Sequence, residues 1–309
     1  MSSPDPGVVI IWTDSARPAK PRPSESSARP RVRSWSRLAQ RAVLLGVPLV
    51  YLGGLLIGPL VAVLQGAFAD GFGAFIAAVT SPNAIHALLM TLALSAFAIV
   101  LNTVFGVAIA WTICRDRFSG RAFLGGLVDL PFAVSPVVVG LMTMLLFGSH
   151  GWFGPWLKGA GVNVLFSWPA MALVTTFVSL PCVVREVTPV LEEIGVGEEE
   201  AARTLGASRV QTFLRVVLPN IRWGIAYGVA LTAARTLGEF GGVLLVSGGL
   251  AGRTETATLL IYRELEERHD TAAHAMAVVL ACASILILVA MEVVRHRRDH
   301  DLRQAGSKS

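Results

Sequence analysis

The chain has 309 residues, of which 53% are hydrophobic and only 15% are charged, and its formal net charge is +5. A soluble globular domain carries closer to a quarter of charged residues. The apolar residues are also concentrated, because no charged residue falls between Ala42 and Ala69. A soluble protein would have to bury several such runs completely, so the composition excludes an ordinary soluble domain and indicates a membrane protein.

The excess of positive charge does not indicate a nucleic-acid partner. The Lys and Arg residues lie at the ends of the apolar runs, where membrane proteins place them. Cys114, Cys182 and Cys282 are too widely spaced for a disulfide framework or a metal knuckle. Since the histidines are scattered as well, we expect no metal site in this chain.

The N-terminal segment differs from the rest. Residues 1–41 are rich in Pro, Ser, Ala and Arg and contain no apolar run long enough to span a bilayer. This composition predicts a disordered, basic cytoplasmic arm rather than a signal peptide.

Six apolar runs follow, and each is long enough to be a transmembrane helix, although the last is only marginally so. Pro131, Pro136 and Pro181 fall in or near these runs, so we expect kinks or breaks there. A cytoplasmic tail should follow at residues 295–309. The predicted spans are 42–64, 86–113, 123–147, 166–185, 223–247 and 273–294.

Positive charge orients these spans. The first loop, around Asp70, has no Lys or Arg, and the third has only Lys158. The second and fourth loops are basic, as are both terminal segments, so the positive-inside rule predicts that both termini face the cytoplasm. The basic residues of these two loops include Arg115, Arg117, Arg121, Arg203, Arg209, Arg215 and Arg222.

The fourth loop, residues 198–219, is more ordered in pattern than a simple connection. It opens with Glu198-Glu199-Glu200, which suits the start of a helix. Gly206 interrupts the helical pattern, and a second amphipathic stretch with Val210, Phe213, Leu214 and Val217 follows. We expect a short helix, a turn, and a second helix that Pro219 terminates before the next span.

This loop resembles the signature loop of ABC-importer permeases. The family pattern is Glu-Ala-Ala, three residues, Gly, nine residues, an aliphatic residue, one residue, and Leu-Pro. Val216 departs mildly from it, since Ile is commoner there. The resemblance implies that the loop docks into a separate ATP-hydrolysing subunit. The matching residues are Glu200, Ala201, Ala202, Gly206, Val216, Leu218 and Pro219.

The fifth span contains two opposite charges, Arg235 and Glu239, at positions i and i+4 of an expected helix. Charges inside a bilayer are tolerated when they pair or when they face a water-filled path. We therefore weigh two interpretations: a salt bridge that only fixes helix packing, and an anion pathway in which Arg235 presents its charge to a passing oxyanion. Gly238 and Gly241 would allow close helix contact or a kink.

The surrounding residues resemble one branch of that family. The sequence around Arg235 and Glu239, with Val246-Ser247-Gly248, is similar to sulfate and molybdate permeases. The block from Asp129 to Val138, and Leu145 to Gly148, resemble the W-type sulfate/thiosulfate permease subunit, and the resemblance extends from about residue 37 to about residue 298. A molybdate or tungstate permease is the alternative.

The resemblance implies an all-α type I ABC importer permease fold of six transmembrane helices, with the first span added beside a five-helix domain at 86–294. It implies two ATPase subunits, a second homologous permease and an extracytoplasmic sulfate-binding protein in a bacterial inner membrane. The chain contains no phosphate-binding loop, so we expect it to bind no cofactor and to leave ATP and Mg²⁺ to the partner ATPase. A secondary transporter and a membrane-embedded enzyme are less favoured, since neither an internal repeat nor a catalytic cluster is evident.

Overall fold

A computed structural model describes residues 34–116 and 118–306, with side chains described for residues 42–116 and 118–293. Most of the predicted disordered arm, at residues 1–33, lies outside the described residues, as do Arg117 and residues 307–309. The chain divides into two compact units, Met1–Leu56 and Ile57–Ser309. All regular elements in the described residues are helices, which agrees with the all-α prediction.

The described residues of the first unit all belong to α1, and this helix continues into the second unit. α1 spans Ser34–Ala67, so residues 34–41, which we expected to belong to the disordered arm, are helical. These residues include the helix formers Leu, Ala, Gln and Arg, and a membrane helix can extend beyond the apolar region when such residues adjoin it. The part of α1 that fits a membrane span is Ala42–Ala67.

The second unit contains the other helices. Short helices in the expected outer loops, such as α2, α6 and α12, were not predicted from the apolar runs. The elements are α2 (Phe72–Val79), α3 (Pro82–Arg115), α4 (Arg121–Ala133), α5 (Pro136–Phe147), α6 (Gly154–Gly159), α7 (Trp168–Ile194), α8 (Gly197–Thr204), α9 (Arg209–Thr212), the π-helix η1 (Phe213–Val217), α10 (Leu218–Leu237), α11 (Gly241–Ser247), α12 (Ala257–Glu266) and α13 (Asp270–Gly306).

Six membrane spans emerge when bent helices are counted as single spans. Within the described residues, four helices are long and apolar enough to cross a bilayer, and two bent pairs pass the same criterion. The α4–α5 pair bends by 108° and the α10–α11 pair by 58°. The spans thus agree with the six predicted from apolar runs, with ends that shift by several residues.

Proline explains one bend but does not break every helix that contains it. α5 begins at Pro136, and the preceding Ser135 is extended, because a residue before proline disfavours helical dihedrals. In contrast, α7 runs without interruption through Pro181 and Pro189. The kink or break expected at Pro181 is thus not a break, since packed neighbouring helices allow a membrane helix to accommodate the missing hydrogen bond.

The centre of the bundle is formed by α3, α7 and α10, which pack against one another. Val183 of α7 lies between Gly106 of α3 and Gly228 of α10, and a Cβ on either glycine would come within 2.8 Å of Val183. Small residues at such contacts let membrane helices approach closely. The outer face of α3 remains apolar, with Leu89, Val100 and other exposed side chains, as expected for a lipid-facing surface.

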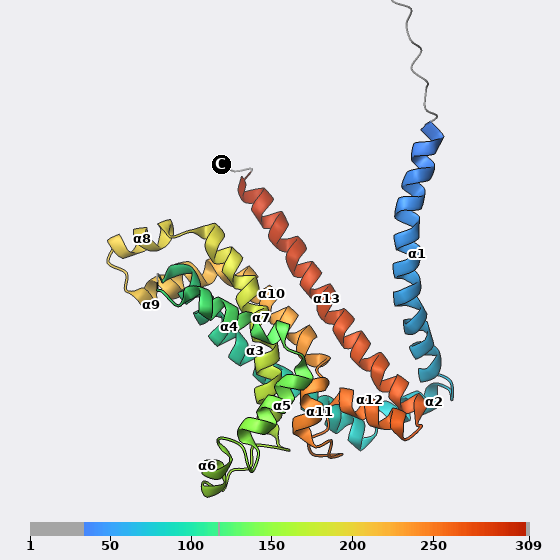
Figure 1. Cartoon of the computed structure of the whole chain (residues 1–309). Coiled ribbons are helices and arrows are strands. Elements are labelled where there is room, and N and C mark those ends of the chain that lie inside the picture. Colours follow the sequence, from blue (N-terminus) through green and yellow to red (C-terminus); the bar gives the residue numbers. More distant parts are fainter. Residues whose placement is uncertain (1–33, 117, 307–309) are drawn as a thin grey trace, which may run out of the picture. The chain divides into compact units, whose positions relative to one another are not determined.

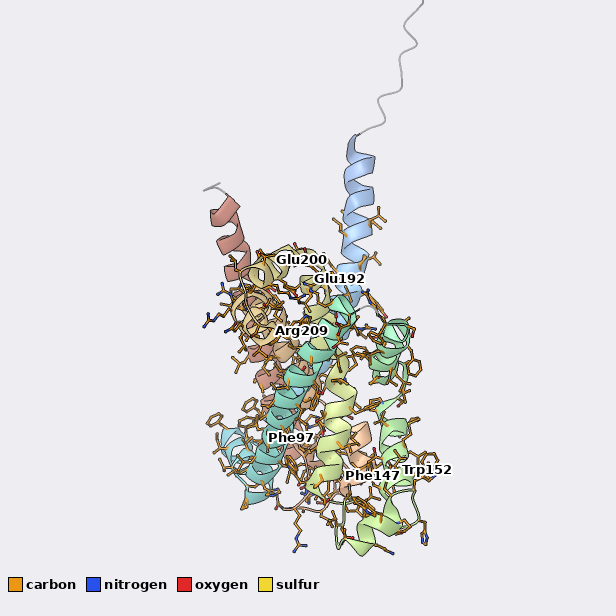
Figure 2. The ribbon with its side chains drawn as sticks, turned by 90° about the vertical axis from the view of Figure 1, so that its left-hand side faces the viewer. Phe97, Phe147, Trp152, Glu192, Glu200 and Arg209 are labelled. Atoms are coloured by element: carbon orange, nitrogen blue, oxygen red, sulfur yellow. The ribbon has the colours of Figure 1, made fainter. Side chains whose placement is uncertain are left out.

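Alternate loops lie at opposite ends of the second unit (Figure 1). One end carries α8 and α9, and we call it the α8 end; the other carries α6, and we call it the α6 end. Figure 2 shows the same separation, with Glu200 and Arg209 at one end and Phe147 and Trp152 at the other. The basic second and fourth loops therefore share the α8 end, as the charge pattern predicts.

Candidate functional site: the coupling loop and the helix break

Residues 198–219, the predicted coupling loop, form a helical hairpin at the α8 end. α8 is followed by a turn in which Gly206 has φ +86°, a left-handed conformation that favours glycine. α9 then begins with a capping box, in which the Ser208 hydroxyl accepts from the Gln211 amide and the Gln211 side chain accepts from the Ser208 amide. The expected helix, turn and second helix are all present.

Pro219 does not end the second helix, contrary to our expectation. α9, η1 and α10 form a continuous helical segment from Arg209 to Leu237, and Pro219 lies in the first turn of α10. The π-helical turn of η1 immediately before it supplies the physical reason. A wider turn changes the hydrogen-bond register just where proline has no N–H to donate, so the chain stays helical.

The family-motif residues form an exposed surface on this hairpin. Glu200 and Ala201 of α8 are exposed, as are Gly206 and Pro219, whereas Ala202, Val216 and Leu218 are half-buried. Large apolar side chains are exposed beside them: Leu205 is 89% exposed and Val210 is 66% exposed. An apolar patch rimmed by charge is typical of a surface that binds another protein.

The rest of the hairpin is anchored to the bundle by its other face. Phe213 stacks on Trp111 of α3 with ring centroids 4.3 Å apart, and Val217 is buried. From α10, the Asn220 side-chain amide donates to Glu198 over 2.5 Å. One face of the hairpin is therefore held by the membrane helices while the Glu200 face remains open.

The charged pair of the fifth span lies at a helix break. Arg235 Nη1 donates to Glu239 Oε2 over 2.8 Å, so the predicted pair forms. The two residues do not share one helical face, however, because α10 ends at Leu237 and α11 begins only at Gly241. A carboxylate just beyond the end of a helix can still reach the guanidinium of an arginine in its last turn, as an i+4 neighbour within a helix does.

Glu239 is buried and fully engaged, whereas Arg235 is partly open. The Glu239 side chain is 4% exposed and that of Arg235 is 33% exposed. The other carboxylate oxygen of Glu239 accepts from the Gly242 amide over 3.1 Å, and the Glu239 carbonyl accepts from the Thr258 hydroxyl over 2.8 Å. Glu239 thus bonds to residues on both sides of the break, and the Arg235 guanidinium is the accessible charge of the pair.

The glycines of this segment differ in what they allow. A Cβ on Gly241 would lie 2.8 Å from Val137 at the start of α5, and one on Gly242 would lie 2.9 Å from the Pro136 carbonyl oxygen. These two glycines let α11 meet α5 closely. Gly238 has no atom within 4 Å of such a Cβ, so it serves the helix end rather than a contact.

Sequence reasoning missed two residues that the structure joins at the α8 end. Arg115, the last residue of α3, pairs with Glu199 of α8 at 2.6 Å, and both side chains are largely buried. We had used Arg115 only as a topology marker and Glu199 only as part of an acidic helix start. A further pair joins Asp129 of α4 to Arg185 of α7 at 2.9 Å.

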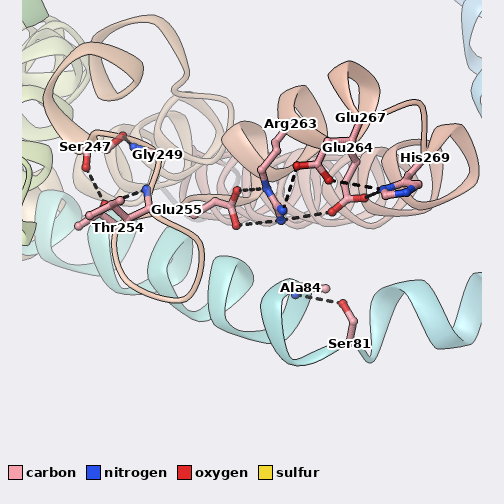
Figure 3. Close-up of polar contacts among 11 residues, drawn as sticks. Ser81, Ala84, Ser247, Gly249, Thr254, Glu255, Arg263, Glu264, Glu267 and His269 are labelled. Carbon is pink, nitrogen blue, oxygen red and sulfur yellow. Dashed lines mark hydrogen bonds and ion pairs between the residues drawn. The ribbon is translucent and has the colours of Figure 1, made fainter.

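Another polar cluster lies between α11 and α13, in α12 and in the loops on either side of it (Figure 3). Glu255 is 1% exposed and accepts two hydrogen bonds from Arg263 of α12, at 2.7 and 3.3 Å. Burial by itself would lower the pKa of the Arg263 guanidinium, but the hydrogen bond and the charge of Glu255, with those of Glu264 and Glu267, raise that pKa overall. Arg263 therefore carries a permanent positive charge within an acidic surround.

The same cluster bears on the expectation that the chain has no metal site. Glu264, Glu267 and His269 bring three potential ligand atoms within 4.8 Å of one another. Arg263 already lies 3.2 Å from Glu264 and 3.5 Å from Glu267. A bound cation would have to compete with this guanidinium, so the cluster is better described as an internal ion-pair network.

The geometry just described combines an exposed helical hairpin at one end of a membrane bundle with a charged break inside it. Residues 102–303 match the family of binding-protein-dependent transport system inner membrane components. The chain belongs to this family. Its place in the inner membrane follows from that membership and from the apolar spans.

Curated members of the family extend the similarity beyond the matched domain. The sulfate transport system permease protein CysW of Synechocystis is 46% identical over 258 residues, which cover 84% of this chain and 94% of that protein. The CysW protein of Escherichia coli is 39% identical and covers 85% of this chain and 90% of its own length. CysT of Escherichia coli, also named a sulfate transport system permease, is 41% identical and covers 82% of this chain and 91% of its own length.

A solved transporter structure contains a chain with the same fold as this protein. A permease chain in the crystal structure of a bacterial ABC transporter that imports alginate has a TM-score of 0.71 and 22% identity. That match covers 85% of this chain and 99% of the other. The type I ABC importer permease fold predicted from the signature loop is therefore confirmed.

Proposed function

We propose that this chain is the permease subunit of an ATP-driven sulfate or thiosulfate importer. The exposed hairpin of residues 198–219 carries the proposal, because a bundle that only sat in lipid would have no use for an ordered, apolar-edged surface outside it. The choice of anion rests on the relatives named for sulfate. These names favour sulfate over the molybdate or tungstate alternative.

Sulfate would enter with the help of several partners. One of two ATPase subunits would bind the hairpin, the two would hydrolyse ATP with Mg²⁺, and this chain would bind no cofactor itself. A second homologous permease would complete the pathway, and an extracytoplasmic sulfate-binding protein would deliver the anion; membrane lipid, rather than nucleic acid, would cover the bundle. The alginate importer was also solved with a periplasmic protein bound to an alginate pentasaccharide, and a chain of that complex has a TM-score of 0.70 to this one.

The helices suggest how work done on the hairpin would reach the anion. The continuous segment from Arg209 to Leu237 begins in the coupling loop and ends beside Arg235 and the break. A helix transmits displacement along its axis because its backbone hydrogen bonds resist compression. A movement of α9 would therefore shift the Arg235 guanidinium relative to α11, which packs on α5 and α7.

Uptake measurements test the substrate directly. In a strain that lacks this chain, radiolabelled sulfate uptake should fall and should return when the chain is supplied with its partner subunits. Excess unlabelled sulfate or thiosulfate should compete, whereas excess molybdate should leave uptake unchanged. Competition by molybdate as strong as that by sulfate would contradict the proposed substrate.

Topology provides a second test. Gly154 begins α6 and Gly206 lies in the turn after α8, at opposite ends of the bundle. With both termini in the cytoplasm, a reporter fused after Gly154 should be active on the outer side, and one fused after Gly206 should be active inside. The reverse pattern would overturn the proposed orientation.

A further inference from the structure

We propose that Arg115 is a positioning residue that couples the hairpin to α3 and α7, so that a displacement of α8 by the ATPase moves these two membrane helices as well as α10. The proposal rests on the function proposed above. It concerns the contacts that Glu199, rather than the family-motif residue Glu200, makes with the membrane helices. Arg115 lies outside the signature loop in the sequence, and it reaches that loop only in the folded chain.

The Arg115 side chain joins three elements: it belongs to α3, and its guanidinium contacts α8 and the end of α7. It extends from the last residue of α3, and its Nε donates to Glu199 Oε1 of α8 over 2.6 Å. Its Nη2 donates to the carbonyl oxygens of Leu191 and Gly195, over 3.1 and 2.6 Å. Leu191 is in the last turn of α7, and Gly195 is the residue that caps this helix. One planar group thus joins the ends of α3 and α7 to the start of α8.

Each contact has the charge that a helix end favours. The carbonyl groups of the last turn of a helix lack partners and attract a cation, which Arg115 supplies to α7. The first turn of a helix attracts an anion, which Glu199 supplies to α8. Gly195 has φ +68°, a conformation that glycine adopts readily, and it turns its carbonyl toward the guanidinium.

The pair is shielded from solvent, unlike the Arg121–Glu192 pair at the same end. The Arg115 side chain is 11% exposed and the Glu199 side chain is 4% exposed. Arg121 and Glu192, which join α4 to α7, are 3.8 Å apart and are 48% and 58% exposed. An exposed pair of this kind constrains its partners little, whereas a buried, multiply bonded pair holds a single geometry.

The surroundings leave α8 room to move around this contact. α8 packs against α9 and η1, and beside the Arg115–Glu199 pair lies a cavity of about 460 Å³. Its walls include Trp111 and Asp116 of the α3 end and Glu200 of α8. Since α8 is not packed solidly onto α3, the ion pair would carry the force between them. Breaking it should let α8 shift without pulling α3, to which it is not joined through the adjacent chain as it is to α7.

The experiment measures sulfate transported per ATP hydrolysed by the complete complex in lipid vesicles. Glu199→Gln removes one charge of the pair, and Arg115→Lys keeps the charge but loses the planar fork that serves three acceptors. Arg121→Gln is the matched control, because it removes an exposed pair at the same end. We expect both test variants to assemble, to hydrolyse ATP and to transport at least about fivefold less sulfate per ATP. The control should keep the wild-type ratio.

The outcomes separate this inference from the proposed function. Assembled complexes of both test variants with an unchanged ratio would overturn the role of Arg115, as would a ratio that falls equally in Arg121→Gln. If Glu199→Gln fails to assemble, the ratio of Arg115→Lys decides. If the wild-type complex transports another oxyanion instead of sulfate, the proposed substrate fails, and the ratio measured with that anion still tests Arg115.

Discussion

Replacement of Arg235 by alanine is expected to lower sulfate uptake by about tenfold or more while the protein remains in the membrane. A hydrogen bond to a charged group contributes about 1.5–3 kcal/mol, and the loss of about 1.4 kcal/mol corresponds to a tenfold change in an equilibrium constant. Arg235 is the accessible partner of the pair, at 33% exposed, so its charge is the one that a passing anion can meet. Uptake in whole cells, with the amount of membrane protein measured alongside, checks this result.

Alanine also leaves Glu239 buried without its partner. Removing one member of a buried pair costs about 3–5 kcal/mol, because the other charge is left uncompensated. The double variant Arg235→Met with Glu239→Gln is therefore the decisive comparison. It removes both charges with little change of volume, and the Gln oxygen can still accept from the Gly242 amide.

The two interpretations of the pair predict different behaviour for this double variant. If Arg235 acts on the anion, the double variant should be as stable as the wild type in thermal unfolding and should still fail to transport. If the pair only fixes packing, the double variant should transport normally. Normal transport would leave Arg235 with a structural role alone.

The second large effect is expected for Glu200→Arg. Glu200 is on the open face of α8, beside the exposed Leu205, while neighbouring Glu199 faces inward to Arg115. Placing the wrong charge at the centre of a protein interface costs several kcal/mol. The variant should lose the ATPase subunit during purification of the complex, and its uptake should fall by about tenfold or more.

Glu193→Arg provides the control for this variant. Glu193 is exposed in the last turn of α7, outside residues 198–219, and its substitution makes the same change of charge. A basic residue near the end of a helix is also compatible with the helix dipole. ATPase retention and uptake should stay near wild type in Glu193→Arg. Full retention of the ATPase by Glu200→Arg would show that this face of α8 is not the contact.

Sequence reasoning could predict the membrane spans and the glycine turn, because both depend on local spacing. The apolar runs gave six spans, and Gly206 was placed correctly at a left-handed turn. The expected end at Pro219 was wrong, and Pro181 does not break α7, for a common reason. Whether a proline ends a membrane helix depends on the turn before it and on the helices packed around it, and neither is encoded in the proline itself.

The sequence alone determined that this chain is a membrane bundle and that residues 198–219 resemble the signature loop of ABC-importer permeases, because composition and short-range spacing carry both signals. Tertiary structure decided which charges meet. Arg115 and Glu199 are far apart in the chain and meet only because α3 and α7 end where α8 begins. Glu239 likewise pairs with Arg235 across a break rather than along one helix. Contacts between distant segments depend on how helices pack, and local spacing contains no record of that packing.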